Sequence, residues 1–295
     1  MSAALDLTRP LVAPTRRWLL VYNCIHVGLQ NCLGLLRPDL QVDAIDFAAF
    51  EKRFDEFRPR LAEYDRIVTA PHFVANASVD FSTIGPVSRL PLTAFEAYHP
   101  DLCYLTVDGQ VLRGPMFDYH SKIITAAYRK GMPMSAVRGL FTGAQYERFG
   151  FLGIWDACKQ VYLGSYADVG LDLAPRFPGW TREGAFMHSV NHPSIRVVAD
   201  IARALLGQDG LEARPTDFVP HDNLKNAPVW PVYDEIAETL GVRGSMLFKV
   251  HNAYRFLDLD EFIARSWETL SPYSPDRVKV FPMYERAMEC IEGSL

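Results

Sequence analysis

The chain has 295 residues, of which 49% are hydrophobic and 22% are charged, and its formal net charge at pH 7 is −5. This composition is typical of a globular protein that can bury a large core, and the modest acidity argues against a general affinity for nucleic acid. The sequence shows no basic, apolar leader before residue 15 and no apolar run of about 18 residues, so we expect a cytoplasmic protein without a membrane span. Its five cysteines are scattered and form no CxxC pair, which predicts neither a disulfide framework nor a structural zinc site.

The N-terminal part alternates apolar segments with amphipathic ones. We expect strands at 18–22, 41–47, 66–70 and 91–96, with helices at 25–36 and 48–63. Strands that alternate with helices of this length predict a small parallel sheet of the doubly wound, flavodoxin-like type.

Beyond about residue 110 the helical period dominates. We expect helices at 117–130, 135–140, 144–166, 194–206, 232–240 and 259–270, separated by long loops rich in proline and glycine. Asn191, followed by His192 and Pro193, is typical of a cap before a helix that starts near residue 194. The expected fold class is therefore α/β and predominantly helical. An α/β subdomain at 15–110 would lie inside a helical, loop-rich cradle at 111–295, as one compact unit.

Cys24 stands where the first expected strand passes into a helix. Ligands of open α/β sheets bind at this end of the strands, and a helix opening there directs unpaired N–H groups at them. Such N–H groups would lower the pKa of the thiol. A small buried apolar side chain is the alternative interpretation of an isolated cysteine, and the sequence leaves the two nearly equal.

Polar clusters at 98–101, 119–122 and 188–193 contain histidines that could act as a base in a reaction at Cys24. A nucleophilic or base-assisted reaction needs an imidazole whose tautomer is fixed, and His99 with Asp101 offers this pair near the end of an expected strand. Each histidine alone is more often a structural residue. His188 and His192 have the spacing of zinc ligands, but Pro193 argues against a shared helical face, and neither GxGxxG nor GxxxxGK[ST] occurs. We therefore predict no metal site and no phosphate-binding loop of either kind.

These clusters together resemble the WcbI-type capsular polysaccharide biosynthesis proteins. The resemblance runs from about residue 18 to about residue 250 and rests on the order and spacing of short motifs. These are Asn23-Cys24, His99-Pro100-Asp101 with Tyr104-Leu105, His120-Ser121, Phe149-Gly150 with Trp155, and Asn191-His192-Pro193. The family's first motif usually continues with glutamine, where this chain has Ile25, so that His26 or another donor would take over any role of that glutamine.

The resemblance implies a bacterial enzyme that binds coenzyme A (CoA) and transfers an acetyl group to a sugar hydroxyl of a capsular or other surface polysaccharide. His99, oriented by Asp101, would be the base, and N–H groups after Cys24 would hold the oxyanion. Cys24 itself would carry the acyl group only in a covalent route, to which we prefer direct transfer. The expected CoA-binding residues are Asn23, His26, Arg113, His120, Ser121, Lys122, Asn191 and His192.

Two other classes of function share these residues. An SGNH-like or thiol esterase would use Cys24 or Ser121 with His99 and Asp101 and would admit water as the acceptor. A non-catalytic protein that binds CoA or a glycan would need the pocket but no base. The sequence does not identify the acceptor sugar, its position, the acyl chain or the oligomeric state.

Overall fold

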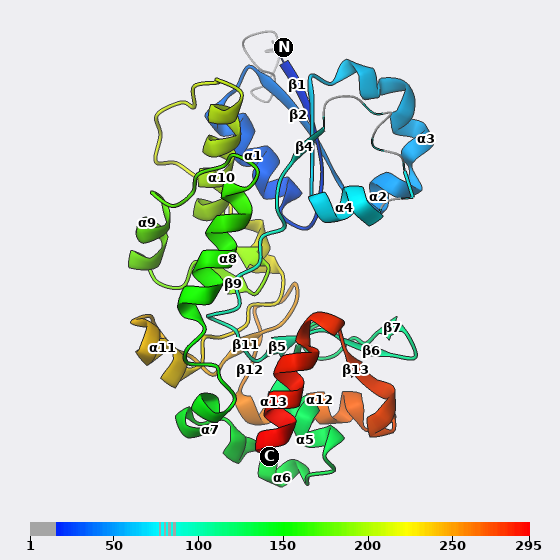
Figure 1. The fold of residues 1–295 in the computed structure, drawn as a ribbon, viewed down its shortest axis with the longest axis vertical. Coiled ribbons are helices and arrows are strands. Elements are labelled where there is room, and N and C mark those ends of the chain that lie inside the picture. The colour runs from blue at the N-terminus through cyan, green and yellow to red at the C-terminus, as the bar shows by residue number, and fades with distance from the viewer. Residues whose placement is uncertain (1–15, 77, 80, 82–83, 85–86) are drawn as a thin grey trace, which may run out of the picture. The chain divides into compact units, whose positions relative to one another are not determined.

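The computed structural model describes residues 16–76, 78–79, 81, 84 and 87–295, so the N-terminal stretch in which we expect no leader lies outside the described residues. The chain forms two compact units (Figure 1). The first contains the chain up to Thr93, together with Leu163–Gly179 and Pro193–Leu224. The second contains Ala94–Tyr162, Trp180–His192 and Lys225–Leu295. The sequence predicts a single boundary between subdomains near residue 110. In the structure, the later segments Leu163–Gly179 and Pro193–Leu224 also belong to the first unit.

A four-stranded sheet organises the first unit. Its order is β2-β1-β3-β4, with β1 at Arg16–Tyr22, β2 at Leu40–Asp46, β3 at Arg66–Thr69 and β4 at Val87–Arg89. Every neighbouring pair is parallel. The predicted α/β class with a small parallel sheet is confirmed.

The fourth strand lies earlier than the sequence predicts. β4 ends at Arg89, and the N–H of Leu90 still donates to the carbonyl of Thr69 at 2.8 Å. The next residue, Pro91, has no N–H with which to continue the ladder, and its carbonyl accepts a hydrogen bond from the Tyr22 hydroxyl. The strand expected at 91–96 is therefore wrong.

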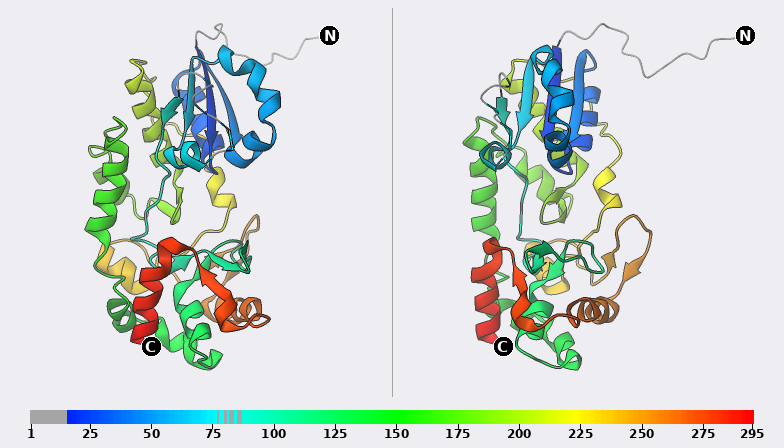
Figure 2. Two further views of the ribbon diagram at one scale, coloured as in Figure 1. Left: turned by 45° about the vertical axis from the view of Figure 1, so that its right-hand side comes forward. Right: turned by 90° about the vertical axis from the view of Figure 1, so that its right-hand side faces the viewer.

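Helices cover both faces of this sheet (Figures 1 and 2). Helix α1 (His26–Leu36) packs against β2 and against α10 (Ile195–Gln208) on one face. The other face carries α2 (Phe47–Lys52), α3 (Phe54–Phe57) and the 3₁₀ segment η1 (Arg58–Glu63). An apolar cluster fills the space beneath these three elements, with Leu19, Val21, Ile45, Phe50, Leu61, Tyr64, Ile67, Phe81 and Ile84 as its buried members. The single helix expected at 48–63 is broken at Arg53, whose backbone is not helical, and its last part is the 3₁₀ segment that begins around Pro59, which cannot donate an N–H inside a helix.

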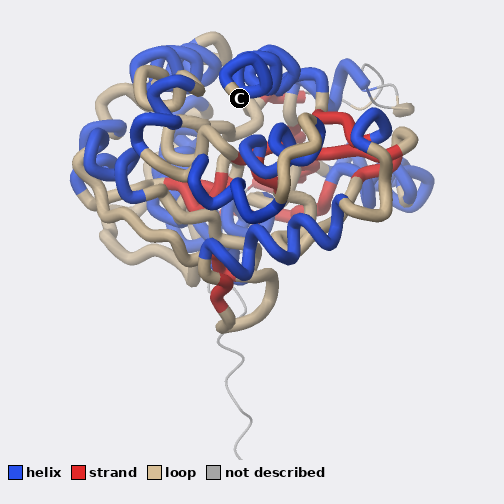
Figure 3. Tube along the Cα trace, turned by 90° about the horizontal axis from the view of Figure 1, so that it is seen from below, coloured by secondary structure: helices blue, strands red, loops and turns tan. Residues whose placement is uncertain are grey.

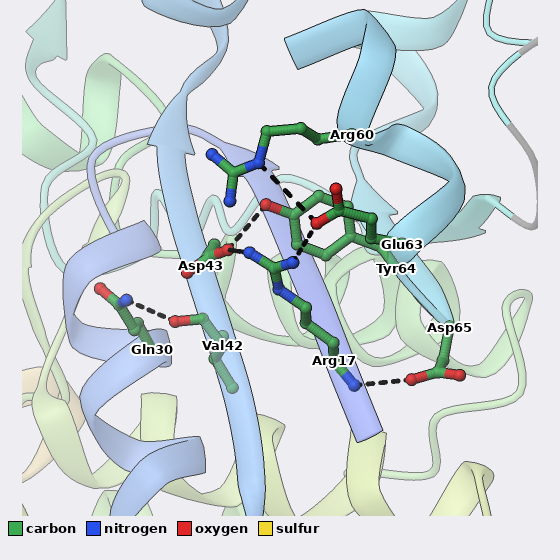
Figure 4. A network of polar contacts seen from close by, with 8 residues as sticks. All are labelled: Arg17, Gln30, Val42, Asp43, Arg60, Glu63, Tyr64 and Asp65. Atoms are coloured by element: carbon green, nitrogen blue, oxygen red, sulfur yellow. Dashed lines mark hydrogen bonds and ion pairs between the residues drawn. The ribbon is translucent and has the colours of Figure 1, made fainter. Parts of the chain in front are cut away.

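A polar network ties η1 to β1 and β2 (Figure 4). Asp43 on β2 accepts hydrogen bonds from Arg17 at 3.0 Å and from the Tyr64 hydroxyl at 2.7 Å, and Arg17 also pairs with Glu63. Burial, and then the hydrogen bond to Asp43, raise the pKa of Tyr64 to about 12. On the opposite side of β2, Gln30 of α1 donates to the Val42 carbonyl at 2.6 Å. Side chains from both faces thus hold β2 at the edge of the sheet.

The second unit is built from short strand pairs, most of them antiparallel, and from helices joined by long loops. Figure 3 marks the helices, strands and loops along the whole chain. Its paired strands are β5 (Leu102–Cys103) with β8 (His120–Ser121), β13 (Val278–Val280) with β6 (Leu105–Val107) and β7 (Gln110–Val111), and β11 (Phe248–Lys249) with β12 (Phe256–Leu257). Strand β9 (Met187–Ser189) pairs with β10 (His192–Pro193). The sequence predicts none of these pairs, because strands of two or three residues are too short to show a period.

Helices complete the two units. The remaining ones are α4 (Pro71–Asn76), α5 (Lys122–Arg129), α6 (Met134–Val137), α7 (Gly143–Arg148), α8 (Trp155–Ala167), α9 (Phe177–Arg182), α11 (Asp234–Leu240), α12 (Leu259–Leu270) and α13 (Glu285–Ser294). The helix predicted at 259–270 is confirmed as α12. The one predicted from residue 117 starts only at Lys122, because Ser121 caps α5. None of the helices in the described ranges is both long and apolar enough to cross a bilayer.

The network around Asp43 gives a test of the first unit. Asp43→Ala removes the acceptor of Arg17 and Tyr64, so we expect the free energy of unfolding to fall by about 1–3 kcal/mol. Asp217→Ala, at an exposed loop position, is the matched control and should change it by less than about 0.5 kcal/mol. Urea unfolding measures both variants. Equal losses in the two would show that the network does not stabilise the unit.

Candidate active site

The carboxyl ends of the parallel strands gather polar residues at one edge of the sheet. Asn23 and Cys24 follow β1, Asp46 ends β2 and Thr69 ends β3. Strand β1 lies between β2 and β3. The connection from β1 to β2 runs through α1 on one face of the sheet, and the connection from β2 to β3 runs through α2, α3 and η1 on the other face. Ligands of open α/β sheets bind where the strand order reverses in this way. Cys24 therefore stands where the topology favours a ligand.

The thiol of Cys24 is half-buried at this edge. Burial raises the pKa of Cys24 to about 12, and the Asp46 carboxylate acts in the same direction. The N–H groups of Cys24 and Ile25 lower the pKa, as we expect from the sequence, but burial outweighs them. The predicted lowering of the Cys24 pKa is therefore wrong, and at neutral pH this side chain is a thiol.

The turn between β1 and α1 is held by Asn23. Its carbonyl accepts hydrogen bonds from the backbone N–H of His26 at 2.9 Å and from His26 Nδ1 at 2.8 Å. Its side-chain oxygen accepts from the N–H of Ile25 at 3.3 Å. Within the described part of the chain, the N–H groups of Val27 and Gly28 in the first turn of α1 have no hydrogen-bond partner. Asn23 thus shapes the opening of α1 beside Cys24.

In the second unit, His99 and Asp101 do not form the predicted pair. The two carboxylate oxygens of Asp101 accept hydrogen bonds from the N–H of Ile123 at 2.8 Å and from the Tyr233 hydroxyl at 2.7 Å. Among the described residues, neither ring nitrogen of His99 has a hydrogen-bond partner, although the backbone of Trp230 lies nearby. The orientation of His99 by Asp101 is wrong, because among the described residues no hydrogen bond joins Asp101 to either ring nitrogen of His99.

Burial also determines the protonation of His99. Its side chain is 1% exposed, and burial lowers the pKa of His99 to about 3, against the opposite effect of the Trp230 backbone. The imidazole is therefore neutral at physiological pH, but it is enclosed by protein. The role of His99 as the base remains a prediction that no contact in the second unit supports.

Lys122 is not a surface cation. It is 2% exposed, its Nζ donates to the Pro100 carbonyl at 2.6 Å, and it lies 4.8 Å from the centre of the Tyr284 ring. A buried ammonium needs such partners. Lys122 serves the second unit as a structural cation, and the predicted contact with a phosphate of CoA is not supported by its surroundings.

Three further predicted CoA-binding residues also have local partners. The Nε2 of His120 bonds to the Leu112 carbonyl at 3.0 Å, and burial lowers the pKa of His120 to about 4. The hydroxyl of Ser121 accepts from the N–H of Ile124 at 3.1 Å as the cap of α5. Arg113 is exposed, with an ion pair to Asp118 at 3.1 Å.

Comparisons with known proteins give the family. A family model described as the polysaccharide biosynthesis enzyme WcbI matches residues 50–214, which is more than half of the chain. The chain belongs to the WcbI family. The resemblance noted in the sequence motifs is thereby confirmed, and the family is one of polysaccharide biosynthesis enzymes.

A solved structure of WcbI shares the fold. It is similar over 94% of this chain and 95% of its own, with a TM-score of 0.67 and 12% sequence identity. That protein is described as a novel polysaccharide biosynthesis enzyme, in its native form without a disulfide bond between CoA and one of its cysteines. No curated protein sequence matches the chain significantly.

The last of the WcbI-like motifs lies in a network of hydroxyl groups. Asn191 accepts hydrogen bonds from Tyr119 at 2.6 Å and from Ser189 at 3.2 Å, and it donates to the Tyr104 hydroxyl at 3.0 Å. The buried ring of His192 lies beside the same Tyr119, whose hydroxyl is 3.3 Å from Nε2. These contacts make Asn191 a central residue of the network.

The predicted capping role of Asn191 is wrong. Helix α10 begins only at Ile195, and the N–H of Ile195 donates to the side chain of Asp222 at 3.1 Å. The sequence pattern points to neither Asp222 nor Tyr233. Neither lies in a motif, and each reaches its partner across a long stretch of chain.

The structure thus brings Asn23, Cys24 and His26 together in the first unit. His99, Asp101, Arg113, His120, Ser121, Lys122, Asn191 and His192 belong to the second unit. Their predicted convergence with Cys24 remains a prediction. Among the described residues, no three His, Cys, Asp or Glu side chains are grouped as they would be around a metal ion.

The low pKa of His99 predicts a pH dependence of stability. Between its ordinary pKa of 6.5 and the folded value of about 3, the unfolded chain binds a proton that the folded chain does not. The free energy of unfolding should therefore fall as the pH drops from about 6.5 to 3, by up to about 1.4 kcal/mol per pH unit for this group. His99→Asn should remove this part of the slope in urea unfolding at about pH 7, 6 and 5. An unchanged slope would contradict the burial of a neutral His99.

Proposed function

We propose that the protein transfers an acetyl group from acetyl-CoA to a hydroxyl group of a sugar in a capsular or other surface polysaccharide. Membership of the WcbI family supports the synthesis of a polysaccharide. The description of the WcbI structure, which names a disulfide bond between CoA and a cysteine, supports CoA as the donor. A cysteine that can form this bond must lie next to the thiol end of CoA.

The observation that carries the proposal is the position of Cys24. Cys32 and Cys103 are buried, Cys158 is half-buried on α8 and Cys290 lies exposed on α13, so none of these four stands at the carboxyl edge of the sheet. Cys24 is half-buried at the carboxyl edge of the sheet, where the strand order reverses. We therefore propose that the thioester end of acetyl-CoA lies against Cys24, and that Asn23 shapes this part of the site.

The same edge supplies donors for the acyl carbonyl. The tetrahedral intermediate of acyl transfer carries a negative oxygen, and hydrogen-bond donors aimed at this oxygen lower the barrier. Among the residues that the structure describes, the N–H groups of Val27 and Gly28 in the first turn of α1 have no hydrogen-bond acceptor. The positive end of the helix adds to their effect. We propose that these two groups hold the oxyanion.

The protonation of Cys24 favours direct transfer over a covalent route. A nucleophilic cysteine reacts as the thiolate, and a pKa of about 12 leaves roughly one thiolate in 10⁵ at pH 7. Moving the acetyl group from one thiol to another also gains little free energy. The same argument disfavours an esterase that uses Cys24 as its nucleophile. In our proposal Cys24 packs beside the thioester and forms no bond to the acetyl group.

The phosphates of CoA need cationic or N–H partners. Lys122 does not fit this role, because its ammonium is buried against Pro100 and Tyr284. Arg113 is exposed and keeps guanidinium donors at the surface. Arg113 therefore remains our proposal for a phosphate contact, and His120, Ser121, Asn191 and His192 support the second unit from within.

Removal of the Cys24 sulfur tests the proposal. We expect the wild-type protein to release CoA from acetyl-CoA faster in the presence of a suitable methyl hexopyranoside, measured by liquid chromatography over a panel of such sugars. Cys24→Ala should retain this turnover within about tenfold, because the direct route needs no nucleophile. Cys290→Ala, at an exposed position on α13, is the matched control.

Two outcomes would contradict this account. Complete loss of turnover in Cys24→Ala, together with an acetylated Cys24 peptide in the acid-quenched wild-type protein, would establish the covalent route. A rate of CoA release that is the same without sugar and with each sugar of the panel would indicate a hydrolase.

A further inference from the structure

The acyl transfer proposed above needs a base, and the buried imidazoles of the second unit are poorly suited to that role. The side chains of His99 and His120 are 1% and 3% exposed. His120 already uses Nε2 on the Leu112 carbonyl, and His192 is buried against Tyr119. A general base must reach the proton that it removes, within hydrogen-bond distance or through one water. An accessible imidazole with a fixed tautomer fits this requirement better.

His26 has such a tautomer. Its Nδ1 lies 2.8 Å from the Asn23 carbonyl oxygen, which can only accept a hydrogen bond. Nδ1 therefore carries the proton, and in the neutral ring the lone pair is on Nε2. A backbone carbonyl or a carboxylate fixes the tautomer of catalytic histidines in the same way. The residue is half-buried, so part of its surface is exposed. Among the described residues, Nε2 is not one of the fully enclosed side-chain atoms that lack a hydrogen bond.

The backbone holds His26 at the right place as well. It is the first residue of α1, and its own N–H bonds to the same Asn23 carbonyl at 2.9 Å, so ring and backbone are tied to one acceptor. Cys24 lies two residues earlier at the carboxyl edge of the sheet. The N–H groups of Val27 and Gly28, which have no acceptor among the described residues, follow directly. One turn of chain thus contains the lone pair of His26 Nε2, N–H donors for the oxyanion and the Cys24 thiol, against which we place the thioester of acetyl-CoA.

We propose that His26, through Nε2, is the general base of the acyl transfer, an inference that rests on the proposed function. Nε2 takes the proton of the acceptor hydroxyl while the hydroxyl oxygen bonds to the acetyl carbon. The bond between this carbon and the sulfur of CoA then breaks, and the imidazolium returns the proton to the leaving thiolate. The products are the acetyl ester and CoA with a free thiol, and His26 is neutral again.

The test compares two substitutions of His26. The amide of His26→Asn can donate to the Asn23 carbonyl as Nδ1 does, but it has no basic nitrogen. We expect this variant to lower kcat for the release of CoA from acetyl-CoA, with a methyl hexopyranoside as acceptor, by roughly 10²–10⁴-fold. The affinity for CoA in calorimetric titration should stay within about threefold. His26→Ala should lose a similar factor and regain part of it with added imidazole.

His251→Asn is the matched control, since His251 is an exposed histidine of the second unit and should keep the wild-type kcat. Turnover of His26→Asn within threefold of the wild type would overturn the assignment of the base and leave acetyl transfer standing. A parallel loss of CoA affinity with no change in kcat at saturating acetyl-CoA would make His26 a CoA contact, and would also overturn it. Absence of sugar-dependent turnover in the wild-type protein would overturn the proposed function and this inference together.

Discussion

The position of β1 between β2 and β3 is the constraint on which the candidate site depends. The chain turns to opposite faces of the sheet after β1 and after β2, so helices cover both faces and the turns after the strands gather at the carboxyl edge. Asn23, Cys24 and His26 follow the central strand directly. The parallel register, from Arg16 opposite Leu40 to Tyr22 opposite Asp46, fixes where these residues stand. A shift in this pairing would move the thiol and the imidazole together.

The local arrangement after β1 depends in turn on a single amide residue. Asn23 accepts from His26 with its carbonyl and from Ile25 with its side-chain oxygen, and the next N–H groups of α1 have no partner within the described part of the chain. Helix openings that keep free N–H groups attract negative charge. Burial at the same edge keeps the Cys24 thiol protonated. The turn therefore combines a neutral thiol with donors for an anionic oxygen, which suits direct transfer from a thioester.

The sequence predicts the first unit well, because its strands and helices are long enough to show their periods. The strand at 18–22, the helix from residue 25 and the strand at 41–47 lie within two residues of β1, α1 and β2. The strand expected at 91–96 fails because Pro91 ends the ladder. The helix expected at 117–130 is present as α5 but starts later, because the cap at Ser121 decides where α5 starts. Apolar periodicity reports which face is buried, whereas backbone donors and caps set the ends.

The chemistry of the second unit could not be derived from the sequence, because burial and long-range partners determine it. His99 and Asp101 are adjacent enough in sequence to suggest a pair. In the structure, however, Asp101 bonds to Tyr233, a residue 132 positions away. The sequence suggests that Lys122 binds a phosphate, but in the structure its ammonium group is buried against the Pro100 carbonyl and the Tyr284 ring. The placement of Cys24 was predictable from the strand and helix pattern. Its pKa was not, because burial raises the pKa more than the N–H groups of the helix opening lower it.

Disulfide exchange with oxidised CoA tests most directly whether the thiol end of CoA lies at Cys24. The Cys24 sulfur would attack one sulfur of the CoA disulfide and release one CoA thiol, and peptide mass spectrometry would locate the adduct. We expect the adduct on Cys24 to form faster than on exposed Cys290, despite the raised pKa of Cys24, because binding holds the two sulfurs together. Excess acetyl-CoA should suppress it. An adduct on Cys290 alone, formed at the same rate with and without acetyl-CoA, would contradict the account.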